Sequence, residues 1–187
     1  MSGRGTIDYN LDSVTLARQL IGAAMLVEGV GGVIVETEAY DPTDPASHSF
    51  AGPTQRNAPM FGPPGRAYVY RSYGMHWCFN VVCGGRGAAV LIRALEPTSG
   101  LELMWERRGM QDERLLCAGP GRLCQALAIT SELNHRELTQ PPFQFVARSE
   151  EPNVIVGPRI GITKAADRPW RFALKGSRYL SRPFPKA

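Results

Sequence analysis

The spacing of apolar residues along this chain predicts both helices and strands. A first helix is predicted from four apolar residues that recur on one helical face: Leu16, Ala17, Leu20 and Ile21. It would begin after a cap at Asp12 or Ser13 and end at Gly22. Strands are predicted where β-branched, aromatic and other apolar residues alternate or run together, at 25–27, 32–40, 67–71, 76–83, 88–95, 143–147, 159–162 and 171–174.

Turn and cap signals connect these elements. A glycine-rich turn at 29–32 would join the first two strands, and residues 72–75 would close a second hairpin with Tyr73 near its tip. The run from Ser99 to Glu102 has the pattern of a capping box and predicts a helix through about Arg108. Pro120 suits the first turn of another helix, at 122–129. Residues 1–10 are predicted to form a short flexible lead.

The length and composition indicate one α+β domain spanning residues 1–187. A chain of 187 residues with 43% apolar content can bury one core but is too short for two ordinary domains. Residues 41–65 are rich in Pro, Gly, Asp, Ser and Thr and follow neither period, so they predict a long loop, and such loops often carry function.

The strand at 33–40 carries the first candidate chemistry. Because side chains alternate across a strand, Glu36, Glu38 and Tyr40 would share one face. Two carboxylates and a phenol on one surface could serve acid–base chemistry, or they could be solvated groups on a half-exposed strand. Tyr73 also has two interpretations: a ring at a hairpin tip beside Gly74 could wedge between DNA bases, or it could fold back onto the sheet.

Charge and cysteine content narrow the class of protein. The chain has 21 Lys and Arg against 17 Asp and Glu, a net charge of +4, and its only lysines are Lys164, Lys175 and Lys186. A surplus of arginine suits contact with nucleic-acid phosphates. The four cysteines form no CxxC pair, so we expect reduced thiols in the cytosol, and no apolar run is long enough to predict a membrane span.

Several sequence blocks resemble the alkyladenine (3-methyladenine) DNA glycosylase family. The blocks are VETEAY at 35–40, HSFAGPTQRNAPMF at 48–61, YVYRSYGMHWCFN at 68–80, LIRALEP at 91–97, CAGPGRLCQALAI at 117–129 and RIGI at 159–162. The resemblance covers 16–180 and implies a mostly antiparallel, curved sheet flanked by helices, with a protruding hairpin. It also implies a monomeric enzyme of base excision repair that acts on duplex DNA containing damaged purines. Because the chain lacks the long N-terminal tail of vertebrate members, we expect a bacterial, cytoplasmic, nucleoid-associated protein; a eukaryotic one would be nuclear.

The resemblance assigns the catalytic roles. It implies that Glu38 activates the attacking water, that Arg93 helps to hold this water and Glu38, and that a backbone carbonyl at Ile160 is a third support. A carboxylate beside the sugar can accept a proton from water and stabilise oxocarbenium-like charge. Glu36 would be a supporting acid, or else a solvated or salt-bridged surface residue, and Arg93 could instead form a structural ion pair.

The resemblance also implies a pocket for a flipped base. Tyr40, His48 and Tyr70 would sandwich the base, since electron-rich rings attract the cationic purines that alkylation produces. Asn80 would crowd the exocyclic amine of a normal guanine, or it could simply satisfy a neighbouring backbone group. A backbone amide near His48 would read the edge of the base.

Further residues are expected to touch the DNA. Tyr73 would be the wedge and Met75 a contact in the groove, although Met75 could also belong to the core. Gly119, Gly121 and Arg122 would contact a phosphate, although helix capping also explains the glycines. The chain departs from the family pattern at Arg122, where some relatives carry lysine, and in the loop from Tyr40 to His48, which is one residue shorter than in vertebrate members.

The predicted mechanism is hydrolysis without strand cleavage. Strand-cutting glycosylases need an amine nucleophile, and no lysine lies near the pocket blocks. The three histidines are scattered and the cysteines lack ligand spacing, so neither metal nor cofactor is implied. Two other functions stay open: a non-catalytic reader of damaged bases, and an RNA-binding module that stacks bases on the same aromatic residues.

Overall fold

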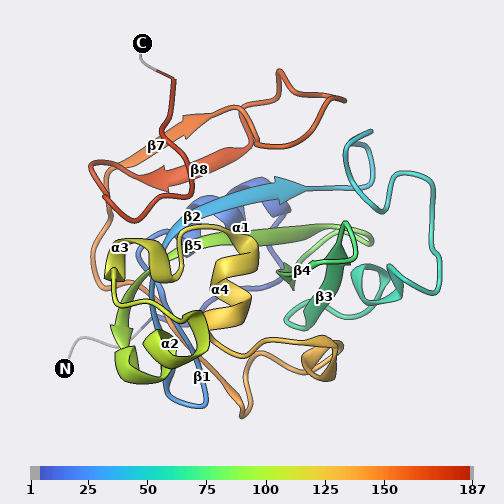
Figure 1. Ribbon diagram of the computed structural model, residues 1–187. Coiled ribbons are helices and arrows are strands. Elements are labelled where there is room, and N and C mark those ends of the chain that lie inside the picture. The colour runs from blue at the N-terminus through green and yellow to red at the C-terminus, as the bar shows by residue number, and fades with distance from the viewer. Residues whose placement is uncertain (1–4, 186–187) are drawn as a thin grey trace.

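Strand β2, Val30–Tyr40, is the centre of the fold and pairs with three other strands. In the computed structural model, which describes residues 5–185, it pairs along its length with β5, Ala89–Ser99. On its other edge β2 pairs first with β1, Ala24–Val27, and then with β8, Arg171–Leu174. Figure 1 shows β2 and β5 side by side through the middle of the molecule.

The remaining strands extend this curled, antiparallel sheet on both sides. Beyond β5 lie β4, His76–Val82, and then β3, Ala67–Ser72; beyond β1 lies β6, Phe143–Val146. Strand β7, Val154–Gly157, pairs with β8. The sheet and its helices confirm the predicted α+β fold.

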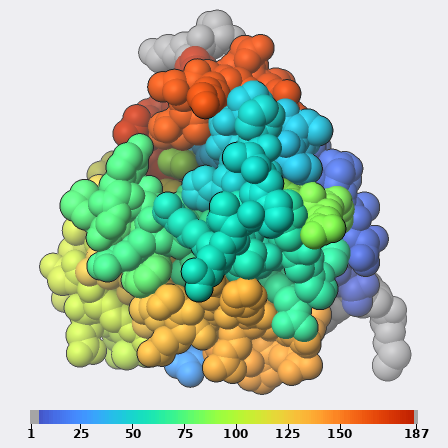
Figure 2. Space-filling view, turned by 90° about the vertical axis from the view of Figure 1, so that its right-hand side faces the viewer, coloured from blue at the N-terminus to red at the C-terminus, as the bar shows by residue number. Residues whose placement is uncertain are grey.

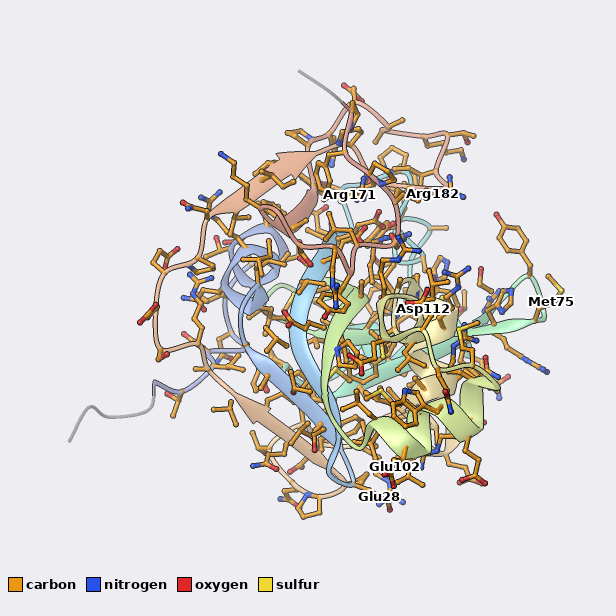
Figure 3. The ribbon with its side chains drawn as sticks, turned by 60° about the vertical axis from the view of Figure 1, so that its left-hand side comes forward. Glu28, Met75, Glu102, Asp112, Arg171 and Arg182 are labelled. Atoms are coloured by element: carbon orange, nitrogen blue, oxygen red, sulfur yellow. The ribbon has the colours of Figure 1, made fainter. Side chains whose placement is uncertain are left out.

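The helices lie on opposite sides of the β2–β5 pair (Figures 1 and 3). Helix α1, Ser13–Leu20, covers the face that carries Thr37, whose hydroxyl donates to the Ala17 carbonyl at 2.8 Å. Helix α4, Pro120–Ala126, packs on β4 and β5 from the other side. The shorter helical segments are α2, Leu101–Arg108, α3, Glu113–Leu116, and the 3-10 turns η1, Ala58–Phe61, and η2, Ser131–Leu133.

The first hairpin turns earlier than its glycines suggested. Its two turn residues are Glu28 and Gly29, both with positive φ, while Gly31 and Gly32 belong to β2. The two later glycines are needed because the backbone approaches closely there: a Cβ on Gly31 would lie 2.0 Å from the Met25 carbonyl oxygen, and one on Gly32 1.8 Å from that of Glu96.

Two further predictions were wrong in detail. The expected capping box does not form, because Ser99 ends β5 and its hydroxyl donates to the Gly29 carbonyl at 2.6 Å, while Gly100 caps α2 in a left-handed conformation. The segment 159–162 is a loop instead of a strand, and the strand of this region is β7. Both runs are short and apolar, and apolar spacing alone does not distinguish a strand from a loop in runs of this length.

The ends of two predicted segments also move. Helix α4 begins at Pro120 and ends at Ala126, just before Ala128 takes a positive φ. Residues 1–4 of the predicted lead lie outside the described residues, whereas Ile7 and Tyr9 pack against the core, with the Tyr9 ring edge-on to Phe145. Burial raises the pKa of Tyr9 to about 12. The last residues of the lead are therefore part of the folded domain.

The β3–β4 hairpin and the loop 41–65 lie beside each other on one face. Figure 2 shows the loop, in cyan, between the C-terminal part of the chain in orange and the hairpin region in green. Apart from η1, residues 41–65 form turns and irregular backbone, as predicted. Across residues 5–185, no helix is both long and apolar enough to cross a membrane.

Changing Gly32 to alanine should destabilise the protein strongly. The new Cβ would overlap a backbone carbonyl that β5 cannot move without breaking its pairing, so we expect a loss of about 2–3 kcal/mol, at the upper end for overpacking. Gly5→Ala is the matched control, because its Cβ would make an ordinary 3.9 Å contact. Urea unfolding of the two variants measures the difference, and equal stabilities would contradict this account of β2.

Candidate active site

Glu38 is a fully buried carboxylate in the wall of an open cavity of about 700 Å³. Its Oε1 accepts the backbone N–H of Ile160 at 2.7 Å, and its Oε2 accepts the hydroxyl of Tyr40 at 2.8 Å. The guanidinium of Arg93 approaches Oε2 at 3.6 Å. Ile160 therefore lies next to the Glu38 carboxylate, and the observed contact is made by its backbone N–H. The expected role of its backbone carbonyl stays a prediction. A buried charge needs such partners, and these three orient Glu38.

Glu36 lies beneath Glu38 and is also fully buried, so it is not the solvated surface residue that the sequence left open. One oxygen, Oε1, accepts from the Nε atoms of Arg93 at 3.1 Å and Arg171 at 2.8 Å. Ser181 adds its backbone N–H at 2.6 Å to Oε2 and its hydroxyl at 2.8 Å to Oε1. We call Glu36, Arg93, Arg171 and Ser181 the Glu36 cluster.

Arg93 joins the two carboxylates. Burial alone would lower the pKa of its guanidinium, but the negative charges of Glu38 and Glu36 outweigh burial, and the pKa is raised. Arg93 therefore stays charged. It is a structural ion-pair partner of Glu36 and lies 3.6 Å from Glu38 at the same time, so the ion-pair interpretation is correct. That Arg93 helps to hold the attacking water stays a prediction.

Aromatic side chains line the cavity. The rings of His48 and Tyr70 meet edge to face with centroids 4.5 Å apart, and Tyr68 stands 5.3 Å from Tyr70. Tyr40 lines the same cavity but belongs to none of these ring pairs among the described residues. Burial, followed by the charge of Glu38, raises the pKa of Tyr40, so this phenol remains a hydrogen-bond donor to Glu38.

His48 sits on the loop 41–65 and is held there by its neighbours. Its carbonyl accepts from Asn57 Nδ2 at 2.8 Å, and its ring Nδ1 lies 3.1 Å from the Tyr68 hydroxyl. One side of the ring is open to the cavity, but the protein encloses enough of it that burial, and then the charge of Arg56, lowers its pKa. The imidazole is therefore neutral at pH 7.

A buried ion pair fastens the loop to the rest of the site. Both guanidinium NH groups of Arg159 contact the carboxylate of Asp44, with NH2 3.0 Å from Oδ1, and NH1 also donates to the Ala39 carbonyl at 2.9 Å. The guanidinium lies 4.7 Å from the ring centroid of Tyr40. Arg159 thus holds the His48 loop, Tyr40 and the neighbouring Ile160 in one arrangement.

Asn80 lines the cavity and also satisfies a neighbour. Its Nδ2 donates to the backbone carbonyl of its cross-strand partner Tyr68 at 3.2 Å. Asn80 therefore satisfies a neighbouring backbone group, which was its second interpretation, and it also lines the cavity. Whether it crowds guanine stays a prediction.

The tip of the β3–β4 hairpin exposes two large apolar side chains. Tyr73 is 88% exposed and Met75 68% exposed, so neither the folded-back tyrosine nor the core methionine is correct. Tyr73 has a positive φ of 51° and lines the cavity mouth. Figure 3 shows Met75 at the outer end of the hairpin, directed away from the body of the protein. Burial energy cannot explain such an exposed pair.

The predicted phosphate contact at α4 is only partly assembled. Gly121 lines the cavity and lies against His76: a Cβ added to Gly121 would lie 2.9 Å from the Cβ of His76. Gly119 precedes the helix with a positive φ of 134°, and the Arg122 NH1 lies 3.5 Å from the Ala118 carbonyl. The contact of these residues with phosphate stays a prediction.

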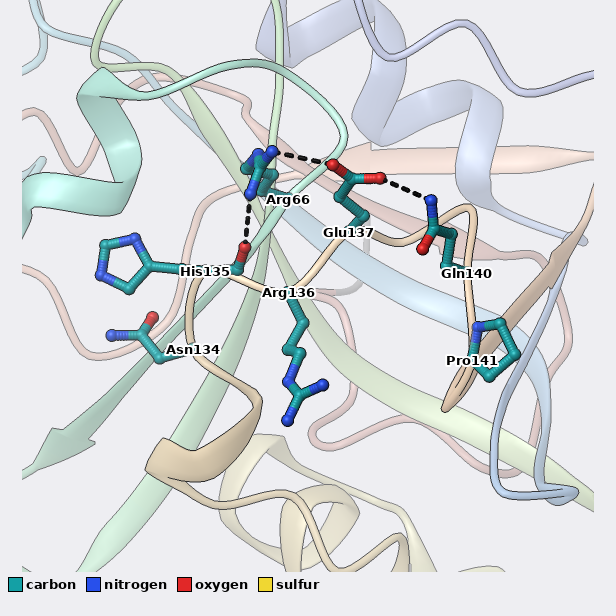
Figure 4. Close-up of a pocket in the computed structure, with 7 residues that line it drawn as sticks. All are labelled: Arg66, Asn134, His135, Arg136, Glu137, Gln140 and Pro141. Carbon is teal, nitrogen blue, oxygen red and sulfur yellow. Dashed lines mark hydrogen bonds and ion pairs between the residues drawn. The ribbon is translucent and has the colours of Figure 1, made fainter.

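A second hollow, of about 410 Å³, lies beneath β3 (Figure 4). Its polar groups already pair with each other: Arg66 reaches Glu137 at 2.8 Å, and Gln140 reaches the other oxygen of Glu137 at 3.0 Å. Because it lacks a buried carboxylate facing aromatic rings, we place the chemistry in the larger cavity.

Sequence reasoning missed four residues of the site. Tyr68 could have been found, because it is two positions before Tyr70 on a strand and so faces the same side. Arg171 and Ser181 are far from Glu36 in sequence, and Arg159 lay in a segment assigned to a strand. No local pattern connects these three residues to the carboxylates.

The site combines a curled sheet, a buried carboxylate in the wall of an aromatic cavity and an exposed hairpin tip, an arrangement that suits an enzyme acting on a base of DNA. Comparison with known proteins agrees. Residues 7–178 match the family model described as methylpurine-DNA glycosylase. The chain belongs to the methylpurine-DNA glycosylase family, and the predicted resemblance is confirmed.

Curated relatives cover nearly the whole chain. A protein of Nitrosospira multiformis is 62% identical over 96% of this chain and 94% of its own length. One from Rhodopseudomonas palustris strain HaA2 is 64% identical over 90% and 85%, respectively, and one from Rhizobium etli is 55% identical over 94% and 87%. Each carries the name "Putative 3-methyladenine DNA glycosylase".

Replacing Glu36 with glutamine should destabilise the folded protein. The change leaves the buried Arg171 without a countercharge and Arg93 with Glu38 alone, at 3.6 Å, and breaking a buried ion pair costs about 3–5 kcal/mol. Glu106→Gln, on the exposed face of α2, removes the same charge as a control and should change stability by less than about 0.5 kcal/mol. Urea unfolding of both variants is the measurement. A Glu36→Gln variant as stable as the control would show that the cluster does not organise the fold.

Proposed function

We propose that this protein flips a damaged purine from duplex DNA and hydrolyses its N-glycosidic bond with water activated by Glu38, leaving an intact strand with an abasic site. The observation that carries this proposal is the buried Glu38 carboxylate, held by Tyr40, Ile160 and Arg93 in the wall of a cavity lined by aromatic rings. Membership of the glycosylase family supports the class of reaction.

The chemistry needs one base and one electrostatic partner. The water oxygen forms a bond to C1′ of the deoxyribose, while the bond from C1′ to the purine nitrogen breaks and its electron pair leaves with the purine. Glu38 accepts the proton released by the water. A cationic alkylated purine leaves as a neutral base, whereas a neutral purine such as hypoxanthine leaves as an anion and acquires a proton. As the bond breaks, positive charge develops on the sugar, and the negative Glu38 stabilises that charge.

The aromatic cavity supplies selection for damaged bases. Alkylation at a ring nitrogen makes many purines cationic, and the π faces of Tyr40, Tyr70 and neutral His48 attract a cation by roughly 0.5–2 kcal/mol. A cationic purine is also the better leaving group. Neutral lesions such as hypoxanthine depend more on the fit of the cavity and on Asn80.

The hairpin tip opens the DNA. A flipped base leaves a gap in the stack, and filling this gap with an apolar side chain offsets an unstacking cost of a few kcal/mol. Tyr73 is exposed at the cavity mouth and suits this role, with Met75 beside it in the groove. The net charge of +4 favours approach to the polyanionic duplex.

Water is the proposed nucleophile because the described part of the chain brings no lysine amine to the cavity. Among residues 5–185 no lysine lines the cavity. A Schiff base with the sugar, which strand cleavage requires, would need such an amine. The product is therefore an abasic site in an uncut strand.

Changing Glu38 to glutamine should abolish excision and preserve binding. Glutamine keeps the shape of the side chain and one carbonyl acceptor but cannot take the proton, so we expect a rate at least about 100-fold lower. Single-turnover excision of hypoxanthine or 1,N6-ethenoadenine from duplex DNA, with binding measured in parallel, is the test. Full activity in the variant would refute the role of Glu38. A wild-type protein that binds the lesion without releasing it would be a damaged-base reader, and tighter binding to single-stranded RNA would indicate an RNA-binding module.

Protonation of His48 should weaken binding of cationic lesions selectively. Its pKa lies below the ordinary 6.5, so the ring is neutral at pH 7 and gains its charge only as the pH falls further. That charge repels a cationic base, and at a few ångströms it is strong enough to lower the affinity about tenfold. We predict that the ratio of affinities for 7-methylguanine over hypoxanthine falls between pH 7 and pH 5.

The matched control removes the titrating ring. Binding is measured in the Glu38→Gln background, so that no base is released, with and without His48→Gln. The second substitution should make the affinity ratio independent of pH, apart from the titration of the lesion itself. An identical fall in both proteins would rule out His48 as the cause.

A further inference from the structure

A short C-terminal segment, residues 181–184, runs against the active site and is fixed there by the buried carboxylate of Glu36. We call it the C-terminal strap. Ser181 donates both its backbone N–H and its hydroxyl to Glu36, at 2.6 and 2.8 Å. The same hydroxyl accepts from Arg93 NH2 at 3.2 Å, and Arg93 in turn lies 3.6 Å from Glu38. The strap is thus one side chain away from the catalytic carboxylate.

Two more contacts fix the residues that follow Ser181. The backbone carbonyl of Arg182 accepts from Arg171 NH2 at 2.5 Å. The ring of Phe184 lies over the guanidinium of Arg171 at 3.9 Å and fills the space where a side chain on Gly157 would stand, 2.8 Å from its Cβ position. Because its backbone is held on both sides, Arg182 starts from a fixed point at the cavity. Figure 3 labels Arg171 and Arg182 together in this region.

The side chain of Arg182 differs from the other arginines of the cavity. Arg93 is buried and engaged with both carboxylates. Arg56 donates to the Arg71 carbonyl at 2.8 Å and lies 5.6 Å from the Tyr70 ring. Arg182 lines the same cavity and is exposed, and its guanidinium makes no hydrogen bond or ion pair with any residue in 5–185. Within the described part of the chain, Arg182 is therefore a positioned cation without a protein partner.

We propose that Arg182 binds a backbone phosphate of the nucleotide that is flipped into the cavity. This rests on the proposed function, because Glu38 must face C1′ for hydrolysis. The base then occupies the aromatic part of the cavity, and the phosphates on either side of the deoxyribose lie toward the mouth. A guanidinium can contact two oxygens of one phosphate, which fixes both position and charge. Arg182 also lies beyond residues 7–178, the part of the chain that the family model describes.

Glu36 also links the strap to the catalytic carboxylate. By binding Ser181 and Arg93 together, Glu36 fixes the position of the Arg182 backbone relative to the proton acceptor, Glu38. A phosphate anchored on Arg182 would therefore place the sugar at a defined position before Glu38. Arg182 itself contacts substrate away from the reacting atoms, so its loss should weaken binding more than it slows excision at saturating enzyme.

The test compares Arg182→Ala, Arg182→Lys and a charge-matched control. Arg18→Ala is the control, because Arg18 is exposed on α1, on the opposite side of the β2–β5 pair from α4. Affinity for a hypoxanthine-containing duplex is measured at several salt concentrations in the Glu38→Gln background. Arg182→Ala should bind about tenfold more weakly, as expected when one charge-assisted hydrogen bond is lost. Its slope of log K against log salt should become shallower by about 1.

The control and the lysine variant sharpen the result. Arg18→Ala should change affinity by less than about twofold, since Arg18 is exposed on α1 and does not line the cavity. Arg182→Lys keeps the charge but loses the forked contact, so it should recover the salt slope and only part of the affinity. Equal effects of Arg182→Ala and Arg18→Ala would overturn the proposal.

Neutral phosphates identify the contact directly. Duplexes that carry a methylphosphonate at the phosphate 5′ or 3′ to the lesion lack one negative charge each. One of them should weaken binding of a protein with Arg182 about tenfold. The same duplex should cost the Arg182→Ala variant almost nothing, since the contact is already absent. If, at both phosphate positions, the loss caused by the methylphosphonate simply adds to the loss caused by Arg182→Ala, the assignment is refuted. Excision by the wild type, absent in Glu38→Gln, tests the proposed function separately.

Discussion

The charge of Glu36 is the constraint on which the rest of this structure depends. A carboxylate without any exposed surface is costly unless it is paired and hydrogen-bonded, and Glu36 meets that need with Arg93, Arg171 and Ser181. These partners come from β5, from β8 and from the chain end, so satisfying one charge ties three distant segments to β2. Arg93 then carries the effect one step further, to Glu38.

Two buried ion networks hold different parts of the cavity wall. The Glu36 cluster fixes the floor and the C-terminal strap, whereas Arg159 and Asp44 fix the wall that carries His48. Arg159 also lies against the outer side of Tyr40, and its neighbour Ile160 donates to Glu38. The loop that carries His48 and the segment that carries Ile160 are thereby held together by one buried ion pair. The hairpin tip is different: Tyr73 and Met75 gain nothing from burial, which fits side chains kept for contact with another molecule.

The distribution of charge within the site follows the expected path of the substrate. Both acids lie inside, each neutralised by arginine, and the exposed guanidinium of Arg182 stands at the mouth. In the proposed mechanism the aromatic rings of the interior attract a cationic purine, Glu38 stabilises positive charge on the sugar, and the exposed Arg182 binds a phosphate. The neutral state of His48 keeps the aromatic part free of a repelling charge at pH 7. Family membership states the class of activity; the arrangement of these charges supports the mechanism proposed for it.

Local sequence determined the elements with strong periodic or terminal signals. Helix α1, both hairpins, the loop 41–65 and most strands follow from apolar spacing and turn residues, and the VETEAY, YVYRSYG and LIRALEP blocks pointed to Glu38, Tyr40, Tyr70 and Arg93 through family resemblance. Short runs carry less information: apolar residues at 159–162 predict a strand where the structure has a loop, and the pattern Ser99–Glu102 predicts a capping box that does not form. Only the tertiary structure decided that Glu36 is buried, that Arg159 pairs with Asp44, and that the strap returns to the site. These contacts join residues more than a hundred positions apart, and whether a charge is buried depends on what the whole chain places around it, which no local spacing records.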